Sequence, residues 1–251
     1  MENQSLKVHV APTDIPSIST AAMIEVDRIM VEELGITLIQ MMENAGSKLA
    51  SLARDAFLNG DSLNKRVRAL AGSGANGGGV LAAARYLFNR GADVSVYTTW
   101  PHDEAREDTL NQLETLRKMG ARLFTASIPP EDEDVELILD GIIGYSINGA
   151  PRRVAAELIR SANASKAPVL SMDVPSGLDA ATGEVYEPAI KAAATMTLVL
   201  PKKGLYAPAA GDITGELYLA DIGVPPGLYS RVGIGRSVDN IFTKETIIRL
   251  A

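Results

Sequence analysis

Cysteine is absent from all 251 residues of the sequence. Disulfide bonds, thiolate zinc sites and cysteine nucleophiles are therefore excluded together. Histidine is scarce as well: His9 and His102 lie far apart without the spacing of a metal site, and no Ser-His-Asp arrangement is indicated. A chain without cysteine fits a reducing compartment, and a cytoplasmic location is the simplest expectation.

The sequence also lacks a membrane-spanning run, since no stretch approaches the ~18 apolar residues that cross a bilayer. Residues 1–19 do not combine a basic region with an apolar core, as a signal peptide would. Positive charge is not in excess, because the net charge is −7 at pH 7, and this disfavours nonspecific binding to nucleic acid or acidic membranes. We therefore expect neither nucleic acid nor membrane as a partner.

Length and composition favour one large α/β domain. Hydrophobic residues make up 46% of the chain and charged residues 22%, as in ordinary globular proteins. Two compact domains would also fit the length, but no Pro-, Ser- or Gly-rich linker and no run of charge divides the sequence. Residues 1–18 are mixed in character and punctuated by proline. We predict an N-terminal arm over residues 1–18 and a single domain over residues 19–251.

Helical and strand patterns alternate through most of the chain. Apolar residues at helical spacing predict two N-terminal helices, over about 20–34 and 37–57, with Gly35 as the stop between them. Further patterns predict strands 67–71, 93–98, 122–126, 135–140, 168–172, 195–200 and 216–219, and helices 80–89, 104–119 and 154–162. This alternation is typical of an α/β fold with a mostly parallel sheet covered on both faces. Beyond Gly204 we expect irregular structure with a short strand or two.

The most informative segment is a glycine-rich turn between a predicted strand and a predicted helix, Gly72-Ser73-Gly74-Ala75-Asn76-Gly77-Gly78-Gly79. Glycines let backbone N–H groups approach an anionic ligand closely, and a helix N-terminus adds favourable partial charge. Gly72, Gly74 and Gly77 satisfy G-x-G-x-x-G. The next strand, however, ends in Tyr97-Thr98-Thr99-Trp100 without the acidic residue that binds ribose in a dinucleotide-binding unit. A tight turn without a ligand therefore stays as an alternative.

A second segment, Met172-Asp173-Val174-Pro175-Ser176-Gly177, follows the predicted strand 168–172. Ligands bind at the carboxyl ends of strands in open α/β sheets. Pro175 and Gly177 restrict the backbone of this turn, so its side chains are presented from a rigid loop. Asp173 is therefore a candidate general acid/base. The alternative is that its carboxylate caps the amides of its own turn.

Asp140 closes another apolar strand and precedes the loop Gly141-Ile142-Ile143-Gly144-Tyr145-Ser146-Ile147-Asn148-Gly149. We expect Asp140 and Asp173 at the same edge of the sheet, because parallel strands end together there. Oxygen-bearing side chains such as Asn76, Asp140 and Ser176 would suit a hard monovalent or divalent cation.

Two lysines, Lys202 and Lys203, follow the predicted strand 195–200 and a proline. A cation at the carboxyl edge of a sheet could face the phosphate of a bound nucleotide. A lysine after a strand can equally be solvated, and the sequence does not separate the two interpretations.

At these residues the sequence resembles the YjeF N-terminal domain family, the NAD(P)H-hydrate epimerases. The similarity extends over most of the chain in ordered motifs: Met42-Glu43-Asn44-Ala45-Gly46, 72–87 with Ala83-Ala84-Arg85, 140–152, Asp173-Val174-Pro175-Ser176-Gly177, Gly183, Pro201-Lys202, Gly204-Leu205 and 220–225. The resemblance implies a Rossmann-like three-layer α/β/α sandwich with a mostly parallel central sheet. It also implies a homodimer, since the family is commonly dimeric.

The resemblance further implies an activity, the interconversion of the R and S epimers of hydrated NADH and NADPH (NADHX and NADPHX). Asp173 would contact the hydrated nicotinamide and act as the catalytic acid/base. Asn76, Asp140 and Ser176 would bind one potassium ion (K+). The substrate would contact Asp173 and two loops, namely Ala75, Asn76, Gly77, Gly78, Gly79, Gly144, Tyr145, Ser146, Ile147, Asn148, Gly149 and Ala150.

The glycine-rich segment departs from the family pattern, Gly-x-Gly-Asn-Asn-Gly-Gly-Asp-Gly, at Ala75, Gly79 and Val80. Ala75 removes a hydrogen-bonding side chain, and Gly79 removes a negative charge near the expected phosphate or metal region. A non-catalytic nucleotide-binding or scaffolding module of the same fold is therefore an alternative, as is an enzyme with a shifted substrate. Family members also occur fused to a dehydratase domain that consumes the S epimer, and we expect a separate dehydratase downstream of this chain.

Overall fold

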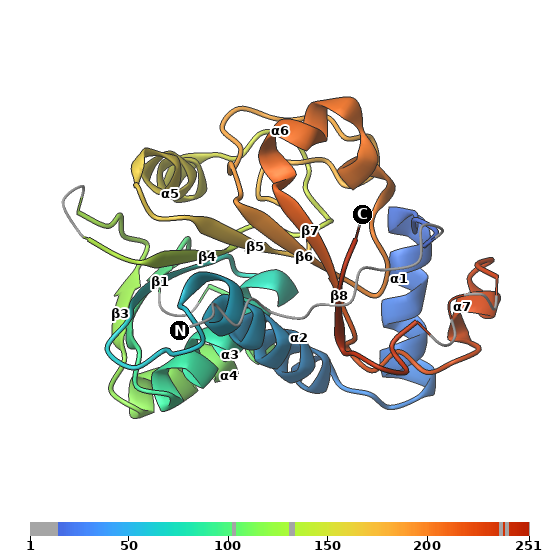
Figure 1. Cartoon of the computed structure of the whole chain (residues 1–251), viewed down its shortest axis with the longest axis horizontal. Coiled ribbons are helices and arrows are strands. Elements are labelled where there is room, and N and C mark those ends of the chain that lie inside the picture. Colours follow the sequence, from blue (N-terminus) through green and yellow to red (C-terminus); the bar gives the residue numbers. More distant parts are fainter. Residues whose placement is uncertain (1–14, 102–103, 131–133, 236–237, 239–240, 251) are drawn as a thin grey trace.

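The computed structural model describes residues 15–101, 104–130, 134–235, 238 and 241–250. Within that part of the chain one sheet contains β1 (Arg66–Ala71), β2 (Asp93–Thr98), β3 (Arg122–Thr125), β4 (Leu137–Gly141), β5 (Val169–Met172), β6 (Ala194–Leu198), β7 (Glu216–Ala220) and β8 (Ile247–Arg249). The strand order is β3-β2-β1-β4-β5-β6-β7-β8, and only β8 runs antiparallel to its neighbour (Figure 1). The mostly parallel sheet predicted from the alternating patterns is confirmed.

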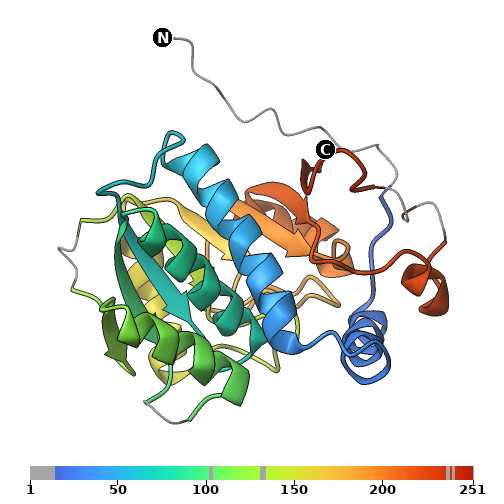
Figure 2. The same cartoon turned by 90° about the horizontal axis from the view of Figure 1, so that it is seen from below.

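Helices cover both faces of this sheet and make it the middle of three layers. They are α1 (Thr20–Arg28), α2 (Leu38–Leu52), α3 (Ala75–Asn89), α4 (Glu107–Lys118), α5 (Arg153–Ala164), α6 (Gly211–Thr214) and α7 (Leu228–Arg231). α2, α3 and α4 lie on one face, whereas α5 and α6 lie on the other (Figures 1 and 2). A large apolar core lies under α2, α3 and α4, and a smaller one joins α5 to the opposite face. The predicted α/β/α sandwich is confirmed.

The order of the strands reverses at β1, which pairs with β2 on one side and with β4 on the other. Such a switch point opens a crevice at the carboxyl ends of the two strands. The backbones after β1 and β4 approach very closely there, because a Cβ on Gly72 would lie 1.7 Å from the carbonyl oxygen of Ile142. Only glycine fits at this crossing, so its place in the glycine-rich segment has a packing reason.

The glycine-rich segment is not a free loop, and the predicted helix start at Val80 is wrong. α3 begins at Ala75, and consecutive glycines form its first turns. Glycine disfavours helix in isolation, but tertiary packing requires it here. A Cβ on Gly78 would lie 2.6 Å from the Met42 sulfur, and one on Gly79 would lie 2.5 Å from the Met172 sulfur.

The two predicted N-terminal helices are present, and both end in a π-helical turn. The Ser19 hydroxyl accepts from the Ala22 amide at 3.1 Å and starts the first helix. Thr37 and Gln40 form a capping box at the start of the second. The π turns are Ile29–Glu33 and Ala53–Phe57.

The predicted arm over residues 1–18 lies largely outside the described residues, as residues 1–14 do. Its last residue, Ile18, belongs to the domain. The Ile18 side chain is 1% exposed, and its amide donates to the Pro201 carbonyl at 2.8 Å. This contact holds the chain beside the segment that follows β6.

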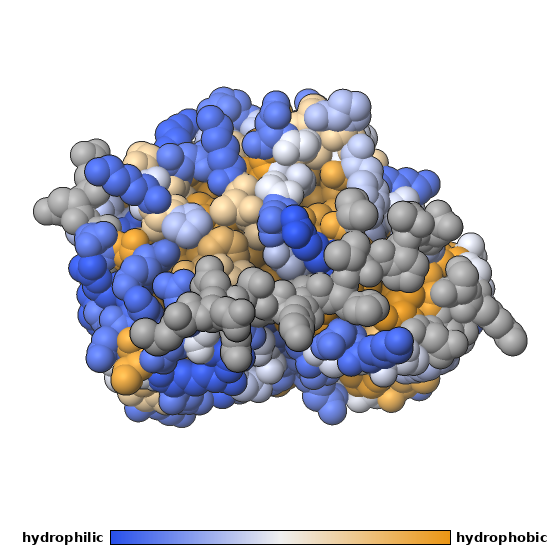
Figure 3. Space-filling model, viewed as in Figure 1, coloured by the Kyte–Doolittle hydropathy of each residue, from blue (hydrophilic) through white to orange (hydrophobic). Residues whose placement is uncertain are grey.

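The described region beyond Gly204 consists of short helices and strands joined by irregular segments, as expected, and it contributes β7 and β8 to the edge of the sheet. Hydrophilic residues dominate the face of the molecule drawn in Figure 3, with hydrophobic patches between them. Across the residues that the structure describes, no helix has the length and apolar character needed to cross a membrane.

Candidate active site

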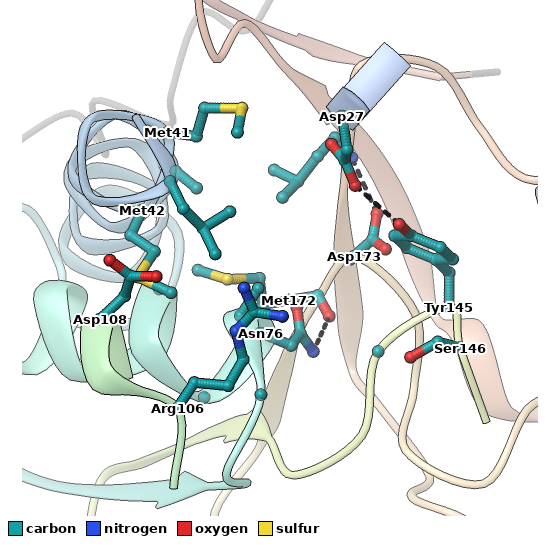
Figure 4. A pocket seen from close by; sticks show the side chains of 18 of the residues that line it. Asp27, Met41, Met42, Asn76, Arg106, Asp108, Tyr145, Ser146, Met172 and Asp173 are labelled. Carbon is teal, nitrogen blue, oxygen red and sulfur yellow. Dashed lines mark hydrogen bonds between the residues drawn. The ribbon is translucent and has the colours of Figure 1, made fainter. Parts of the chain in front are cut away.

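A pocket of about 1010 Å³ lies at the carboxyl edge of the sheet. Its walls come from α1, α2, the start of α3 and the loops that follow β2, β4, β5 and β6 (Figure 4). This is the edge at which ligands bind in open α/β sheets. A volume of this size is at the upper end of pockets for small molecules and cofactors.

Asp173 follows β5 at the wall of this pocket and is 3% exposed. Its backbone is left-handed, with φ of 65°, a conformation that costs a non-glycine residue of order 1 kcal/mol and recurs at functional sites. Its Oδ1 accepts from Lys202 Nζ, from the Leu198 amide at 3.3 Å and from Thr197 Oγ1 at 3.4 Å. The carboxylate therefore does not cap its own turn.

Lys202 is completely buried at the pocket, so the interpretation that it is solvated is wrong. Its ammonium donates to Asp173 and, at 2.9 Å, to the Leu198 carbonyl. The chain re-enters the interior after β6, where Ile18 packs beside it, and burial of a lysine requires a charged partner. Lys203, the next residue, is exposed.

Asp140 lies at the carboxyl end of β4 as predicted, one residue before the strand ends, but it is buried and is not part of the pocket wall. Its carboxylate accepts four hydrogen bonds: from Ser176 Oγ at 2.6 Å, Ser171 Oγ at 2.8 Å, the Ser176 amide at 2.9 Å and the Ile142 amide at 3.2 Å. Burial raises the pKa of Asp140, and the hydrogen bonds from Ser176, Ser171 and Ile142 oppose that rise. The residue ties the β4 and β5 loops together.

Asn76 lies in the first turn of α3 and donates from Nδ2 to the Met172 carbonyl at 3.0 Å. A Cβ on Gly144 would lie 3.2 Å from the Asn76 Cβ, so Asn76 also contacts the loop after β4. That loop is hydrogen-bonded to Ser176, whose Oγ accepts from the Ile143 amide at 2.8 Å. Asn76, Ser176 and Asp140 thus surround one place where two loops and a helix meet.

The donor set at this place fits a cation of low charge. It offers amide, hydroxyl and carbonyl oxygens with a single carboxylate, the ligands that hard cations prefer. The described residues include no group of three or more acidic or histidine side chains that could hold a metal ion. A single carboxylate among neutral oxygens suits a monovalent ion better than a divalent one.

Asp27 was not predicted as a site residue, yet it faces the pocket from α1. Tyr145 Oη donates to Asp27 Oδ2 at 2.6 Å, and both side chains lie beside Asp173 (Figure 4). A signal was present in the sequence, because Asp27 lies on the same helical side as Met23 and Met30, which are buried. A carboxylate on a buried helical face needs a partner.

The predicted substrate-binding residues divide into two groups. The pocket wall includes Ala75, Asn76, Gly77, Gly79, Gly144, Tyr145, Ser146 and Asp173. It does not include Gly78, Ile147, Asn148, Gly149 or Ala150. Gly78 faces Met42 between helices. Arg106, which sequence reasoning missed, also lines the pocket, from the position before α4 (Figure 4).

Comparison with known proteins identifies the family. The family model described as YjeF-related protein N-terminus matches residues 38–204. The chain belongs to this family. It is 44% identical to the NAD(P)H-hydrate epimerase of Dehalogenimonas lykanthroporepellens, over 88% of this chain and 87% of that protein. It is 37% identical to the NAD(P)H-hydrate epimerase of Cenarchaeum symbiosum, over 74% of this chain and 85% of that protein.

Longer proteins match as well. The Bifunctional NAD(P)H-hydrate repair enzyme Nnr of Moorella thermoacetica is 35% identical over 84% of this chain, and the match spans 41% of that enzyme. Among solved structures, yeast ynu0 (YNL200c) superposes with a TM-score of 0.75 at 25% identity, covering 94% of this chain and 100% of that one. The family resemblance read from the motifs is confirmed.

Proposed function

We propose that this protein is an NAD(P)H-hydrate epimerase, which interconverts the R and S forms of NADHX and NADPHX. One observation carries the proposal: Asp173, a buried and strained carboxylate, faces a nucleotide-sized pocket. The 44% identity to an epimerase over 88% of the chain supports the same substrate.

The pocket offers separate sites for the two ends of such a substrate. The amides of Ala75, Asn76 and Gly77 belong to the first turn of α3, so they have no acceptor within the helix and can bind phosphate oxygens. Arg106 adds a guanidinium that suits phosphate. The hydrated nicotinamide would then lie toward Asp173, which is on the opposite side of Asn76 from Arg106 in Figure 4.

The reaction at the ring needs only acid/base chemistry. Protonation of the ring hydroxyl lets it leave as water, and the ring nitrogen stabilises the resulting iminium ion. Water can then add to either face of the ring, which gives the R or the S form. A carboxylate beside the ring stabilises the cationic intermediate electrostatically.

A potassium ion held by Asn76, Asp140 and Ser176 is part of this proposal. The ion would bind next to the first turn of α3 and lock the β4 and β5 loops, whose hydrogen bonds converge on Asp140. When bound, it would supply positive charge beside the substrate phosphates.

The departures from the family pattern raise one alternative, a module that binds a nucleotide without turnover. Two of the three positions have packing roles: Val80 is fully buried, and Gly79 faces the Met172 sulfur. Ala75 is exposed at the pocket. The departures therefore change helix packing more than the acid/base residues, and we favour the enzyme.

We also propose that the protein acts as a homodimer, with a separate dehydratase consuming the S form. Three large apolar side chains on and after α1 support a protein contact: Ile24 is 58% exposed, Leu34 46% and Val31 43%. Sedimentation velocity with Leu34→Lys as a variant would test the dimer, since Leu34 lies outside the pocket wall and a charge in the contact should yield monomers.

The proposed function is tested by incubating purified protein with R-NADPHX, with and without potassium, and separating the epimers by chromatography. We expect conversion by the parent protein, faster conversion with potassium and loss of conversion in Asp173→Ala. Asp93→Asn is a matched control, since Asp93 pairs with Arg122 at the amino edge of the sheet. A folded parent that binds NADPH without converting R-NADPHX would instead support the binding module.

A further inference from the structure

A second carboxylate lies in the pocket beside Asp173, and it comes from α1, ahead of the segment that matches the family. Asp27 is held by the phenol of Tyr145, at 2.6 Å. Asp27, Tyr145, Asp173 and Lys202 all line the same pocket. Figure 4 shows Asp27 and the Tyr145 hydroxyl close to the Asp173 carboxylate.

These four side chains contain two carboxyl groups but one ammonium group. Lys202 supplies one buried ammonium, and it lies against Asp173. Asp27 has no ion pair of its own among the described contacts, and its hydrogen bond comes from a neutral phenol. The two carboxylates therefore sit in different environments, one beside a cation and one beside a phenol. In several enzymes two carboxyl groups with different environments take the separate roles of acid and base.

The titration of Asp27 agrees with that difference. Burial is the largest effect and raises the pKa of Asp27, and the nearby charge of Asp173 raises it further. The hydrogen bond from Tyr145 and the charges of Lys202 and Arg106 oppose the rise without cancelling it. The charged and titratable groups that act on Asp27 from the packed elements are Tyr145 after β4, Asp173 after β5, Lys202 after β6 and Arg106 before α4.

We propose that Asp27 carries the proton of the epimerase reaction and delivers it through the hydroxyl of Tyr145, while Asp173, paired with Lys202, stabilises the cationic ring. This assignment rests on the proposed function. It gives Tyr145 the contact with the reacting hydroxyl, and it makes Asp27 a positioning residue that acts through Tyr145.

The proton balance closes with these groups alone. The Tyr145 hydroxyl gives its proton to the ring hydroxyl, the carbon–oxygen bond breaks, and water leaves as the nitrogen lone pair forms the iminium bond. The carboxyl proton of Asp27 passes to the Tyr145 oxygen along their hydrogen bond. When water adds to the other face, it returns one proton by the same route, so Asp27 is protonated again and nothing is oxidised or reduced.

The test compares kcat, KM and the pH profile of the parent, Asp27→Asn, Asp27→Glu and Tyr145→Phe, with Asp93→Asn as control. Asp27→Asn keeps the size and a hydrogen-bond acceptor but cannot carry the proton. We expect kcat to fall about 10²–10⁴-fold, with little change in KM. The kcat of the parent should fall at high pH, where Asp27 is ionised. The residual kcat of Asp27→Asn should not show this fall. Asp27→Glu should recover part of kcat.

Three outcomes would overturn the assignment. They are a parent-like kcat and pH profile in Asp27→Asn, a loss expressed only in KM, and a Tyr145→Phe variant as active as the parent. If Asp27→Asn did not fold, Tyr145→Phe and Asp27→Glu would decide between the same outcomes. A parent protein without epimerase activity would refute the proposed function itself, whereas an active parent with an indifferent Asp27→Asn would refute this assignment alone.

Discussion

The ammonium of Lys202 lies against the carboxylate of Asp173 beneath the pocket, and their side chains are 0% and 5% exposed. Each charge depends on the other, because an ionised group buried without a partner is strongly disfavoured. The pair also holds the β5 and β6 ends together, through the hydrogen bonds that both groups make with Leu198. Catalytic geometry and stability are therefore coupled at this site.

Asp173→Asn should destabilise the protein by about 3–5 kcal/mol, because Lys202 would stay buried without its counter-ion. Asparagine tolerates the left-handed backbone of this position. The loss of stability would therefore come from the missing negative charge and not from backbone strain. The double variant Asp173→Asn/Lys202→Met should recover most of the stability without recovering activity. Urea unfolding at neutral pH measures the stability of the single and the double variant. Equal stability of the two would contradict the coupling between Asp173 and Lys202.

Gly46→Ala should destabilise the contact between α2 and α3 by about 1–3 kcal/mol through overpacking. The new Cβ would lie 2.5 Å from the Ala82 Cβ and 2.8 Å from the Ala83 amide nitrogen. Gly211→Ala is the matched control, because a Cβ there meets nothing within 4 Å. Thermal unfolding of the two variants should separate them, and similar melting temperatures would disprove the steric explanation.

Asp140→Asn should cost about 1–3 kcal/mol, since the new NH2 group would face donors that now point at a carboxylate. The variant should also lose any stabilisation by potassium, because the carboxylate is the one negative ligand of the proposed ion. Unfolding would be followed with potassium and with sodium at equal ionic strength. A potassium effect that persists in Asp140→Asn would place the ion elsewhere.

Asp27→Asn should change how stability depends on pH. Because the folded-state pKa of Asp27 is raised, its contribution to stability is present below the ordinary pKa of about 3.9 and is lost as the pH rises through the folded value. The parent should therefore lose stability relative to Asp27→Asn over that window. Urea unfolding of both proteins at a series of pH values measures the difference, and parallel curves would count against a raised pKa.

Arg106→Ala should raise KM with little change in kcat, because a phosphate contact far from the ring binds the ground state and transition state alike. Arg117→Ala is the control on α4, the helix that follows Arg106, where Arg117 pairs with Glu114 in a surface contact. Steady-state kinetics with NADHX and NADPHX would show whether the added phosphate uses this guanidinium. An unchanged KM for both substrates would remove Arg106 from the binding site.

The sequence was most reliable where a signal is local. Alternating patterns placed the strands within a few residues, and the run from Asp173 to Gly177 marked a strand end that faces a ligand. The start of α3 was misplaced for a physical reason. Glycine propensity argues against helix at Gly77, Gly78 and Gly79, but close contacts with Met42 and Met172 make glycine necessary there.

The partners of the polar side chains could not be predicted in the same way. Tyr145 and Asp27 are 118 residues apart, and Lys202 meets Asp173 across 29 residues. The sequence around each residue indicates that it lies at a strand end or on a helix face, but it does not indicate which residue it contacts. Which residues meet depends on how α1 packs against the loop after β4 and how the chain turns inward after β6.

The sequence by itself determined the alternation of strands and helices, the acidic residues at the ends of β4 and β5, and the motifs of the family. These follow from side-chain periodicity and turn chemistry, which act over a few residues. Only the tertiary structure decided that Lys202 is the counter-ion of Asp173, that Asp140 is enclosed and that Asp27 enters the pocket. Those outcomes depend on burial, because a polar group removed from water must find its partner among residues that are distant in the chain.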